Sequence, residues 1–260
     1  MLRLYLDDAG SQTNDQKPIF AVGGYVAPVD VWDSFSVVWQ RVLNEMKSPP
    51  YHATDCEPGP NGCGHGEFSD WNTNKLLELK SRLAPLTLQL SAGVGRVLIV
   101  PEHNEYLLNE PVLVNRIQGA REYLPLFLLL ETVLDWIAYG WPDKPEGDEI
   151  EVIFETGTKG LALATNVFRW LRENMSWASN TYTEELGFGD KILPPLQAAD
   201  MLAFSAYKDI EGRLCTPPRV ERKILTVLRQ HGRLSFKGVA VDDYPIIREM
   251  YIKWAKQWMP

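Results

Sequence analysis

Two hydrophobic runs of strand length each end in an acidic residue. Residues 2–7 (LRLYLD) end in Asp7, and residues 150–155 (IEVIFE) end in Glu155. Short apolar runs rich in β-branched and aromatic residues are typical of buried strands. A buried carboxylate that has no partner costs several kcal/mol or takes up a proton. We therefore expect both acids to meet a partner at the end of their strands.

A third acid, Asp200, lies within the otherwise small and apolar sequence PPLQAADMLAF. The two prolines at its start are typical of the first turn of a helix. Carboxylates that converge from strand ends and a helix form an all-oxygen site suited to Mg²⁺ or Mn²⁺. Asp7, Glu155 and Asp200 are therefore the predicted metal ligands. Taken singly, Glu155 is equally well explained as a solvent-facing acid. A structural hydrogen-bond acceptor is the alternative for Asp200, but here we favour the metal site.

Asp7 is followed directly by Asp8, and only one of the two can face the site from a regular strand. Side chains alternate between the two faces of a strand, and here the leucines at positions 2, 4 and 6 share one face. This alternation assigns Asp7 to the other face, together with Tyr5. We favour Asp7 as the ligand and interpret Asp8 as a turn residue.

Strand-like and helical patterns alternate along the chain after an antiparallel start. The expected strands cover residues 2–7, 19–26, 86–100, 150–155 and 181–188, and the expected helices cover 31–46, 69–83, 115–139, 161–174 and the segment from 194. A β-like segment, LSFKGVAV, and a final aromatic helix ending at Trp258 follow in the tail. This order predicts an α/β protein with a mixed sheet that helices cover on both faces.

Size and composition indicate one globular domain. The chain has 260 residues, of which 45% are hydrophobic and 23% charged, as in ordinary globular proteins. Its first residues enter a strand pattern without a charged leader, and its apolar runs are too short for a bilayer. Three cysteines are too few for a disulfide framework. We expect a cytoplasmic protein without a membrane partner; no pattern specifies an oligomeric state.

Charge is distributed unevenly along the chain. The net charge is −8, which argues against a protein that coats nucleic acid. Residues 208–237, however, carry eight Lys and Arg against three acids, a local charge of +5. A basic segment beside an acidic site suits an enzyme that processes phosphodiesters. For any single basic run of this kind, a solvated helix face is the preferred explanation.

The polar loop YHATDCEPGPNGCGH has two interpretations that involve chemistry. His52 and Asp55 can lie at the mouth of the acidic site, where His52 would move protons. Alternatively His52, Cys56, Cys63 and His65 bind a structural zinc ion. Their spacing lacks the paired C-x2-C turn of common zinc knuckles. We therefore rank the first interpretation highest, an ordinary polar surface loop second and zinc third.

Several of these segments together resemble the DUF3800 family, which is related to ribonuclease-H-like nucleases. The resemblance rests on YLDDAG, FAVGGYV, HATD, GEFSDW, VIFETG and LQAADMLAF, and spans about residues 2–207. It implies a ribonuclease-H-like α/β fold with a five-stranded mixed sheet. It also places Asp7 at the metal-ligand position after the first strand, Glu155 at the end of the fourth, and Asp200 near the start of the last core helix. The family commonly has Asp-Glu-Ser-Gly where this chain has Asp7-Asp8-Ala9-Gly10.

The resulting expectation is a single ribonuclease-H-like domain over residues 1–260. It would carry a helical insertion at 28–85 and a basic C-terminal extension at 209–260. The predicted function is a Mg²⁺- or Mn²⁺-dependent nuclease acting on DNA or RNA. Asp7, Glu155 and Asp200 would bind the metal, His52 would assist, and Glu131 and Asp135 are held in reserve as a fourth ligand. The alternatives are a non-catalytic interaction module of the same fold and a zinc-stabilised protein.

Overall fold

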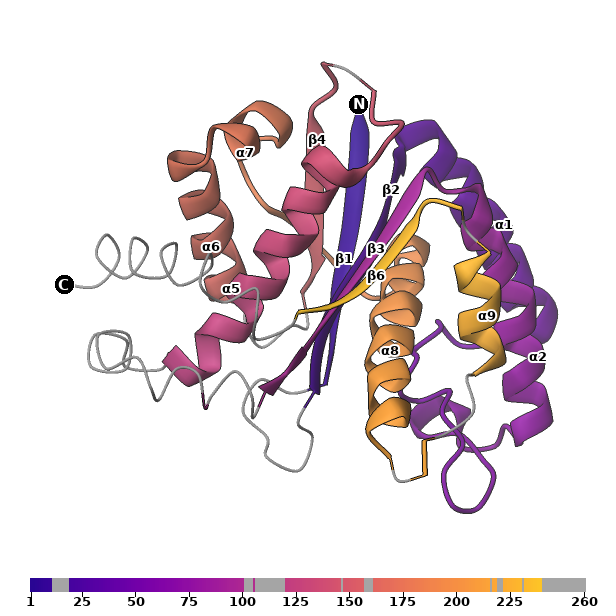
Figure 1. Cartoon of the computed structure of the whole chain (residues 1–260). Helices are drawn as coiled ribbons and strands as arrows, with labels where there is room; N and C mark the ends of the chain where they lie inside the picture. Colours follow the sequence, from indigo (N-terminus) through magenta and orange to yellow (C-terminus); the bar gives the residue numbers. More distant parts are fainter. Residues whose placement is uncertain are drawn as a thin grey trace.

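A mixed β-sheet forms the centre of the protein in a computed structural model, which describes residues 1–10, 19–100, 105, 120–145, 147–156, 161–215, 217–218, 222–230 and 232–239. Within these ranges the strands are β1 (Leu2–Gly10), β2 (Ile19–Pro28), β3 (Ala92–Ile99), β4 (Ile150–Glu155), β5 (Gly187–Gly189) and β6 (Leu234–Val239). They lie in the order β5-β4-β1-β2-β3-β6 (Figure 1). The pairs β1–β2 and β2–β3 are antiparallel, whereas β1–β4, β4–β5 and β3–β6 are parallel.

The α/β class and the mixed sheet are confirmed, but the sheet has six strands where the sequence predicts five. The sixth is β6, from the segment expected only as a β-like part of the tail. It joins the sheet because Leu234–Val239 pairs in parallel with residues 93–98 of β3. The fifth strand is shorter than expected: β5 spans three residues, and Tyr182 forms an isolated bridge to Ile150.

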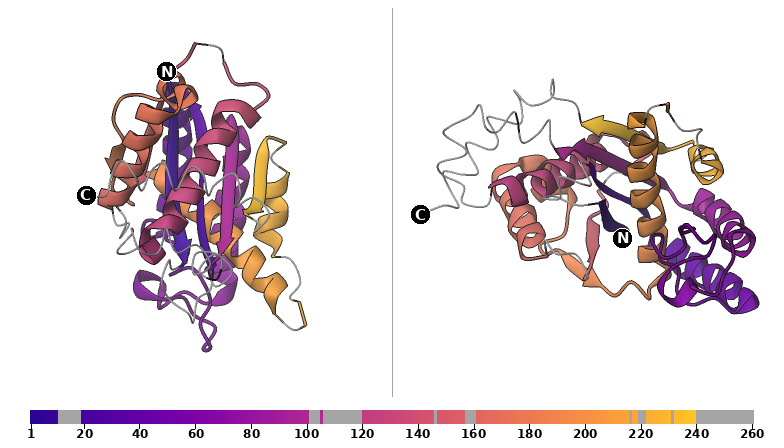
Figure 2. Two further views of the ribbon diagram at one scale, coloured as in Figure 1. Left: turned by 60° about the vertical axis from the view of Figure 1, so that its left-hand side comes forward. Right: turned by 90° about the horizontal axis from the view of Figure 1, so that it is seen from below.

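Helices cover both faces of the sheet (Figure 2). On one face lie α5 (Ala120–Asp135), the π-helical turn η3 (Trp136–Gly140), α6 (Leu161–Asn174) and α7 (Ser176–Thr181). On the other lie α8 (Pro194–Leu214), α1 (Val29–Met46), α2 (Thr73–Leu83) and α9 (Lys223–Arg229), with the 3-10 turns η1 (Gly66–Phe68) and η2 (Ala84–Gln89). None of the helices in the described ranges is long and apolar enough to cross a bilayer.

The alternation along β1 separates two hydrophobic cores. Leu2, Leu4 and Leu6 belong to the core beneath α5 and α6, whereas Tyr5 belongs to the core beneath α8. Asp7 has the same parity as Tyr5 and therefore faces the α8 side. Both faces of β1 are buried, as expected for a strand with a parallel neighbour in a sheet covered by helices.

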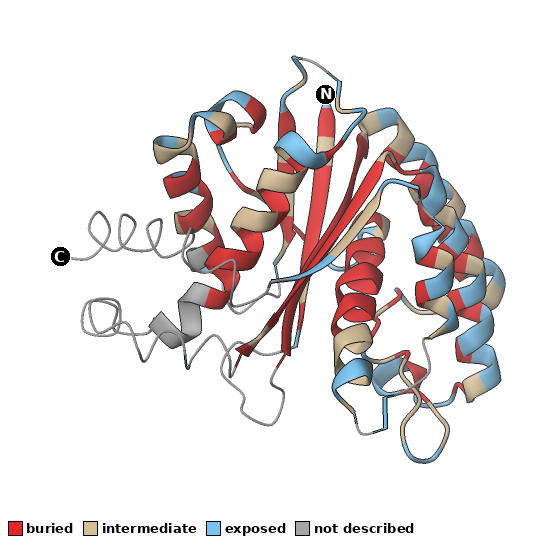
Figure 3. Ribbon diagram, in the orientation of Figure 1, coloured by how far each residue is buried: buried red, intermediate tan, exposed pale blue. Residues whose placement is uncertain are grey.

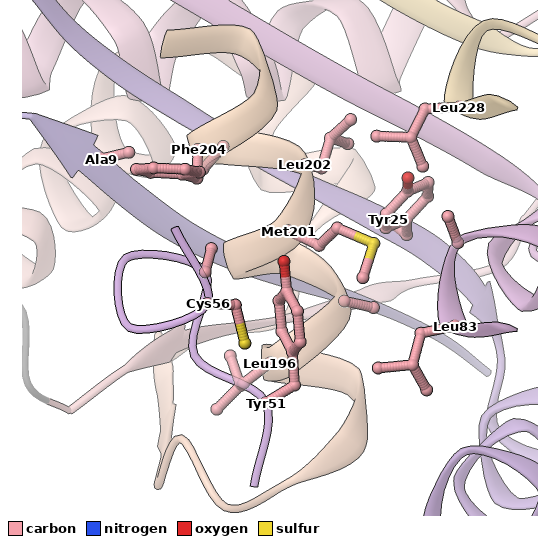
Figure 4. Close-up of a cluster of buried hydrophobic side chains, with 14 of the residues drawn as sticks. Ala9, Tyr25, Tyr51, Cys56, Leu83, Leu196, Met201, Leu202, Phe204 and Leu228 are labelled. Atoms are coloured by element: carbon pink, nitrogen blue, oxygen red, sulfur yellow. The ribbon is translucent and has the colours of Figure 1, made fainter. Parts of the chain in front are cut away.

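Helix α8 is buried on nearly all sides over its first two thirds (Figure 3). Every residue from Pro195 to Tyr207 is buried. A helix this apolar all round needs neighbours on more than one side. The sheet covers one side of α8, and α1 and the loop that follows it cover another. In that core Tyr51 and Cys56 of the loop lie beside Leu196 of α8, with Met201 nearby (Figure 4).

The remaining segments follow the expected order with shifted bounds. The helices α1 and α2 lie between β2 and β3, where a helical insertion is predicted at 28–85, and η2 continues the irregular part to Gln89. Helix α8 continues to Leu214, so the predicted start of the C-terminal extension at residue 209 falls inside a helix. Residues 115–119 of the expected long helix and the tail helix ending at Trp258 lie outside the described residues.

Candidate functional site

The three predicted carboxylates and His52 line one cavity of about 190 Å³ on the α8 side of the sheet. They come from three elements and a loop: Asp7 from β1, Glu155 from β4, Asp200 from α8, and His52 from the segment after α1. The full lining is Asp7, Tyr51, His52, Glu155, Lys191, Leu196, Gln197 and Asp200. Residues up to 193 positions apart in the sequence thus share one cavity.

The strand register brings Asp7 and Glu155 together. Strands β1 and β4 are parallel, with Leu6 opposite Phe154. The next residue on each strand is acidic, so Asp7 and Glu155 follow at neighbouring positions and on the same face. Across the other side of β1, Asp7 is paired with Gly23, which has no side chain and lets α8 approach the sheet closely. The choice of Asp7 over Asp8 agrees with the cavity lining.

Asp200 lies in the second turn of α8 and is 8% exposed. Its Oδ2 accepts a hydrogen bond of 2.7 Å from the backbone N–H of Ala53. One turn earlier on the helix, the buried Gln197 accepts hydrogen bonds at Oε1 from Trp39 Nε1 (2.8 Å) and from the backbone N–H of Tyr51 (2.9 Å). These bonds attach the loop that carries His52 to the helix that carries Asp200.

Burial and mutual repulsion raise the pKa values of two of the carboxyl groups. Burial raises the pKa of Asp7 well above its ordinary value, and the charges of Asp200, Asp8 and Glu155 raise it further, against the N–H of Asp8, which donates to Asp7 Oδ1 at 2.7 Å. Burial likewise raises the pKa of Asp200 to about 6, opposed by the Ala53 N–H and by His52. A cation between these groups would relieve the repulsion and favour their ionised forms.

His52 lines the cavity, and its ring contacts Asp55, which is not part of the lining. The Nδ1 atom of His52 is buried and lies 3.0 Å from Asp55 Oδ2, without the directionality of a hydrogen bond. The side chain as a whole is 37% exposed, so its exposure belongs to the other ring atoms. Gly66, with φ +52°, passes so close to Asp55 that a Cβ there would lie 2.9 Å from Oδ2. The loop is therefore folded tightly around Asp55.

The donor chemistry of the cavity suits a hard divalent cation, but the carboxylates are not gathered into a three-ligand set. Among the described residues, no group of three or more His, Cys, Asp or Glu side chains is placed to hold one metal ion. Magnesium is commonly bound by only one or two carboxylates, and water and phosphate oxygens complete its octahedron. The acids of the cavity therefore fit a magnesium ion that is bound by one or two of these carboxylates.

The four residues of the zinc interpretation form no such group in the described part of the chain either. Cys56 is fully buried in the hydrophobic core beneath α8, and this burial raises the pKa of its thiol to about 12. A zinc ligand must be a thiolate, so the surroundings of Cys56 favour the wrong protonation state. Cys63 instead forms a backbone bridge with Asn72, next to the start of α2.

Glu131 and Asp135 are wrongly predicted as reserve ligands, because α5 covers the opposite face of the sheet. There the two acids interact with one another, and Asp135 also interacts with Arg96 of β3. Burial, and secondarily the charge of Asp135, raises the pKa of Glu131 to about 7. Helical periodicity shows that the two acids share a helix face, but it does not determine which side of the sheet that helix covers.

The cavity also includes residues that the sequence analysis does not single out: Tyr51, Lys191, Leu196 and Gln197. Gln197 could have been found, because it is a polar residue three positions before Asp200 in an otherwise apolar stretch. Lys191 has no comparable signal, since it lies in the connection between β5 and α8. It brings a cation to a cavity that otherwise collects acids.

The basic segment at residues 208–237 is largely neutralised by ion pairs. Five of its eight Lys and Arg residues pair with acids: Lys208 with Glu211, Arg213 and Arg229 with Asp209, Arg222 with Glu57, and Arg233 with Asp143. Arg219 and Glu221 lie outside the described residues. The local charge of +5 therefore does not translate into a row of unpaired cations in the described part of the segment.

Comparisons with known proteins add no assignment. No protein-family model matches the chain, and no curated protein matches it. The resemblance to the DUF3800 family stays a prediction from the quoted sequence segments. The observation that bears on function is therefore the composition of the cavity.

Proposed function

We propose that this protein is a divalent-metal-dependent nuclease of ribonuclease-H-like fold. One observation carries the proposal: three acids from β1, β4 and α8, distant in sequence, line the same cavity with a histidine. Buried like charges are costly, and nothing in the two hydrophobic cores requires them. Burial and neighbouring carboxylates raise the pKa values of Asp7 and Asp200, and such perturbed acids in a cavity are typical of a functional site.

The arrangement of the sheet supports the fold assignment. Strands β1 to β5 form a mixed sheet in which three antiparallel strands are followed by two parallel ones. Asp7 lies in the second half of the first strand, Glu155 at the end of the fourth and Asp200 on the helix after the fifth, close to the positions that the family resemblance implies. We take β6 as an addition at the edge next to β3.

In the proposed site Asp7, Glu155 and Asp200 would hold Mg²⁺ or Mn²⁺. The Ala53 N–H already occupies Oδ2 of Asp200, so Asp200 offers its other oxygen. Bound Mg²⁺ or Mn²⁺ would supply an activated water and charge stabilisation for an in-line displacement at phosphorus.

The other residues of the cavity handle the substrate and its protons. Lys191 contacts a phosphate oxygen, since it is the cation in the described lining. His52 presents the exposed edge of its ring, away from Asp55, to donate or accept a proton. At about 190 Å³ the cavity has room for a phosphodiester group and its ions, so the bases of DNA or RNA would stay outside.

The proposal is tested by thermal unfolding with and without Mn²⁺, together with cleavage of plasmid DNA and of RNA. At a free Mn²⁺ concentration of about 100 times Kd, binding adds about 2.7 kcal/mol. This corresponds to a rise in Tm of roughly 5–10 °C for a chain of this size. Asp7→Asn should remove most of the rise and the cleavage. Asp8→Asn, a matched change on the opposite face of β1, should keep both.

Failure to raise the Tm at millimolar Mn²⁺, with no cleavage by the wild type, would favour the alternative of a non-catalytic module. The observation that favours this alternative is that no three-ligand group occurs among the described residues. Equal losses in Asp7→Asn and Asp8→Asn would also count against the assigned site, because only one of these side chains faces the cavity.

A further inference from the structure

Gln197 is a buried polar side chain whose hydrogen bonds connect three separate parts of the protein. It is 1% exposed. Its Oε1 accepts from Trp39 of α1 and from the backbone N–H of Tyr51, and its Nε2 donates to the carbonyl of Ile192 at 2.9 Å. A buried amide with satisfied bonds on both its oxygen and its nitrogen has its rotamer fixed.

Gln197 and Asp200 lie three residues apart on α8, and each binds a backbone N–H of the same short segment. Gln197 receives the N–H of Tyr51, and Asp200 receives that of Ala53. The residue between these two anchors is His52. Residues at i and i+3 of a helix face the same side. One face of α8 therefore binds the backbone of Tyr51 and of Ala53, the residues on either side of His52.

Burial alternates along the anchored segment. The side chains of Tyr51 and Ala53 are 3% and 0% exposed, and both belong to the core beneath α8. That of His52 is 37% exposed and lines the cavity. Figure 4 shows Tyr51 packed beside Cys56 and Leu196 in this core. With both neighbours anchored and buried, His52 can project only toward the cavity.

We infer that Gln197 is a positioning residue for His52, acting through the backbone of Tyr51. The expected effect on cleavage rests on the proposed nuclease function, whereas the anchoring of the His52 segment by Gln197 does not depend on it. Asp200 would have two roles, because it would bind the metal and also accepts the N–H of Ala53. Gln197 is uncharged, so its role would be only to hold the loop in position. Loss of its acceptor should leave the metal ligands in place and release the histidine.

The test is amide hydrogen exchange of the metal-free protein combined with steady-state kinetics. Gln197→Met keeps the length of the side chain and removes the acceptor. A net hydrogen bond of about 1 kcal/mol implies that exchange of the Tyr51 and Ala53 amides speeds up by about five- to tenfold. Cleavage should lose about tenfold in kcat, as expected for a displaced proton-transfer group, while KM and the Mn²⁺ dependence of Tm stay near wild type.

Trp39→Phe is the matched control, because it removes the other donor to Oε1 and keeps an aromatic ring in the core. It should lower stability but leave amide exchange at Tyr51 and Ala53, and kcat, near wild type. If both variants speed exchange equally, Gln197 acts through general packing and the inference is overturned. Unchanged exchange in Gln197→Met overturns it as well.

If Gln197→Met fails to fold, Gln197→Glu decides, since it keeps oxygen acceptors within reach of Trp39 and Tyr51. The inference then expects the Tyr51 and Ala53 amides to stay protected. Faster exchange of these amides in Gln197→Glu would overturn it. Faster exchange in Gln197→Met, in a protein whose wild type cleaves nothing, would support the positioning role and reject the proposed nuclease function.

Discussion

Asp7 and Asp200, the cavity acids whose pKa values are raised, destabilise the metal-free protein at neutral pH, and Asp200 shows this most directly. Its pKa is raised from 3.8 to about 6, chiefly by burial. A raised pKa in the folded state means that the protonated form is favoured there. The stability gained from this proton is fully present below pH 3.8 and is lost as the pH rises through about 6.

Asp200→Asn should therefore be more stable than the wild type above neutral pH in metal-free buffer. A pKa rise from 3.8 to about 6 corresponds to roughly 3 kcal/mol. Asparagine keeps an oxygen for the Ala53 N–H, so the loop anchor survives. We expect urea unfolding to show no difference near pH 4 and a growing advantage of the variant up to pH 8. Parallel stability profiles of the two proteins would contradict this assignment.

At the scale of secondary-structure elements, the site depends on how closely α8 approaches the sheet. A Cβ added to Gly23 of β2 would lie 3.1 Å from the backbone of Ala203 on α8 and 3.3 Å from the carbonyl of Val94. Gly23 is paired with Asp7, and Ala203 follows Asp200 by three residues. The spacing between the two acids is thus set by a glycine that is not in the cavity.

Gly23→Ala should push α8 outward and weaken cation binding. Overpacking of this kind costs roughly 1–3 kcal/mol in stability. The Mn²⁺-dependent rise in Tm should shrink, because Asp200 moves away from Asp7. Gly238→Ala is a suitable control, since a Cβ at this position of β6 meets no atom within 4 Å. A full Mn²⁺ response in Gly23→Ala would show that the helix spacing does not control the site.

This dependence on packing explains what the sequence could and could not predict. Strand length places Glu155 at the end of β4, and alternation places Asp7 on its face of β1, because these are properties of neighbouring residues. The end of β1 is predicted wrongly, since the strand continues past Asp7 to Gly10 through its pairing with β2. The side of the sheet that a helix covers is a long-range property, so Glu131 and Asp135 are misplaced. The parallel pairing of β6 with β3, and the hydrogen bond from the Tyr51 N–H to Gln197, join segments about 140 residues apart and leave no local pattern.

At the scale of the whole molecule, the charge distribution makes the proposed binding of nucleic acid depend on the metal. The chain has a net charge of −8, and most of the basic residues at 208–237 are paired with acids. Few cations are then left in the described part of this segment to displace counterions from a phosphate backbone. Lys191 and the bound ions would provide most of the attraction at the cavity.

We therefore expect His52→Ala, which keeps the three carboxylates but cleaves slowly, to bind a labelled single-stranded oligonucleotide only when Mn²⁺ is present. Each neutralised phosphate of a single strand contributes about −0.7 to the slope of log Kobs against log salt, so a slope shallower than about −2 is expected. Lys191→Ala should flatten it further by the contribution of one phosphate, whereas Lys223→Ala, outside the cavity lining, should not. Fluorescence anisotropy across a salt series measures these slopes. Tight binding in EDTA with a steep slope would instead locate the nucleic-acid contacts on a basic surface, because without the ions the acids of the cavity can only repel a phosphate backbone.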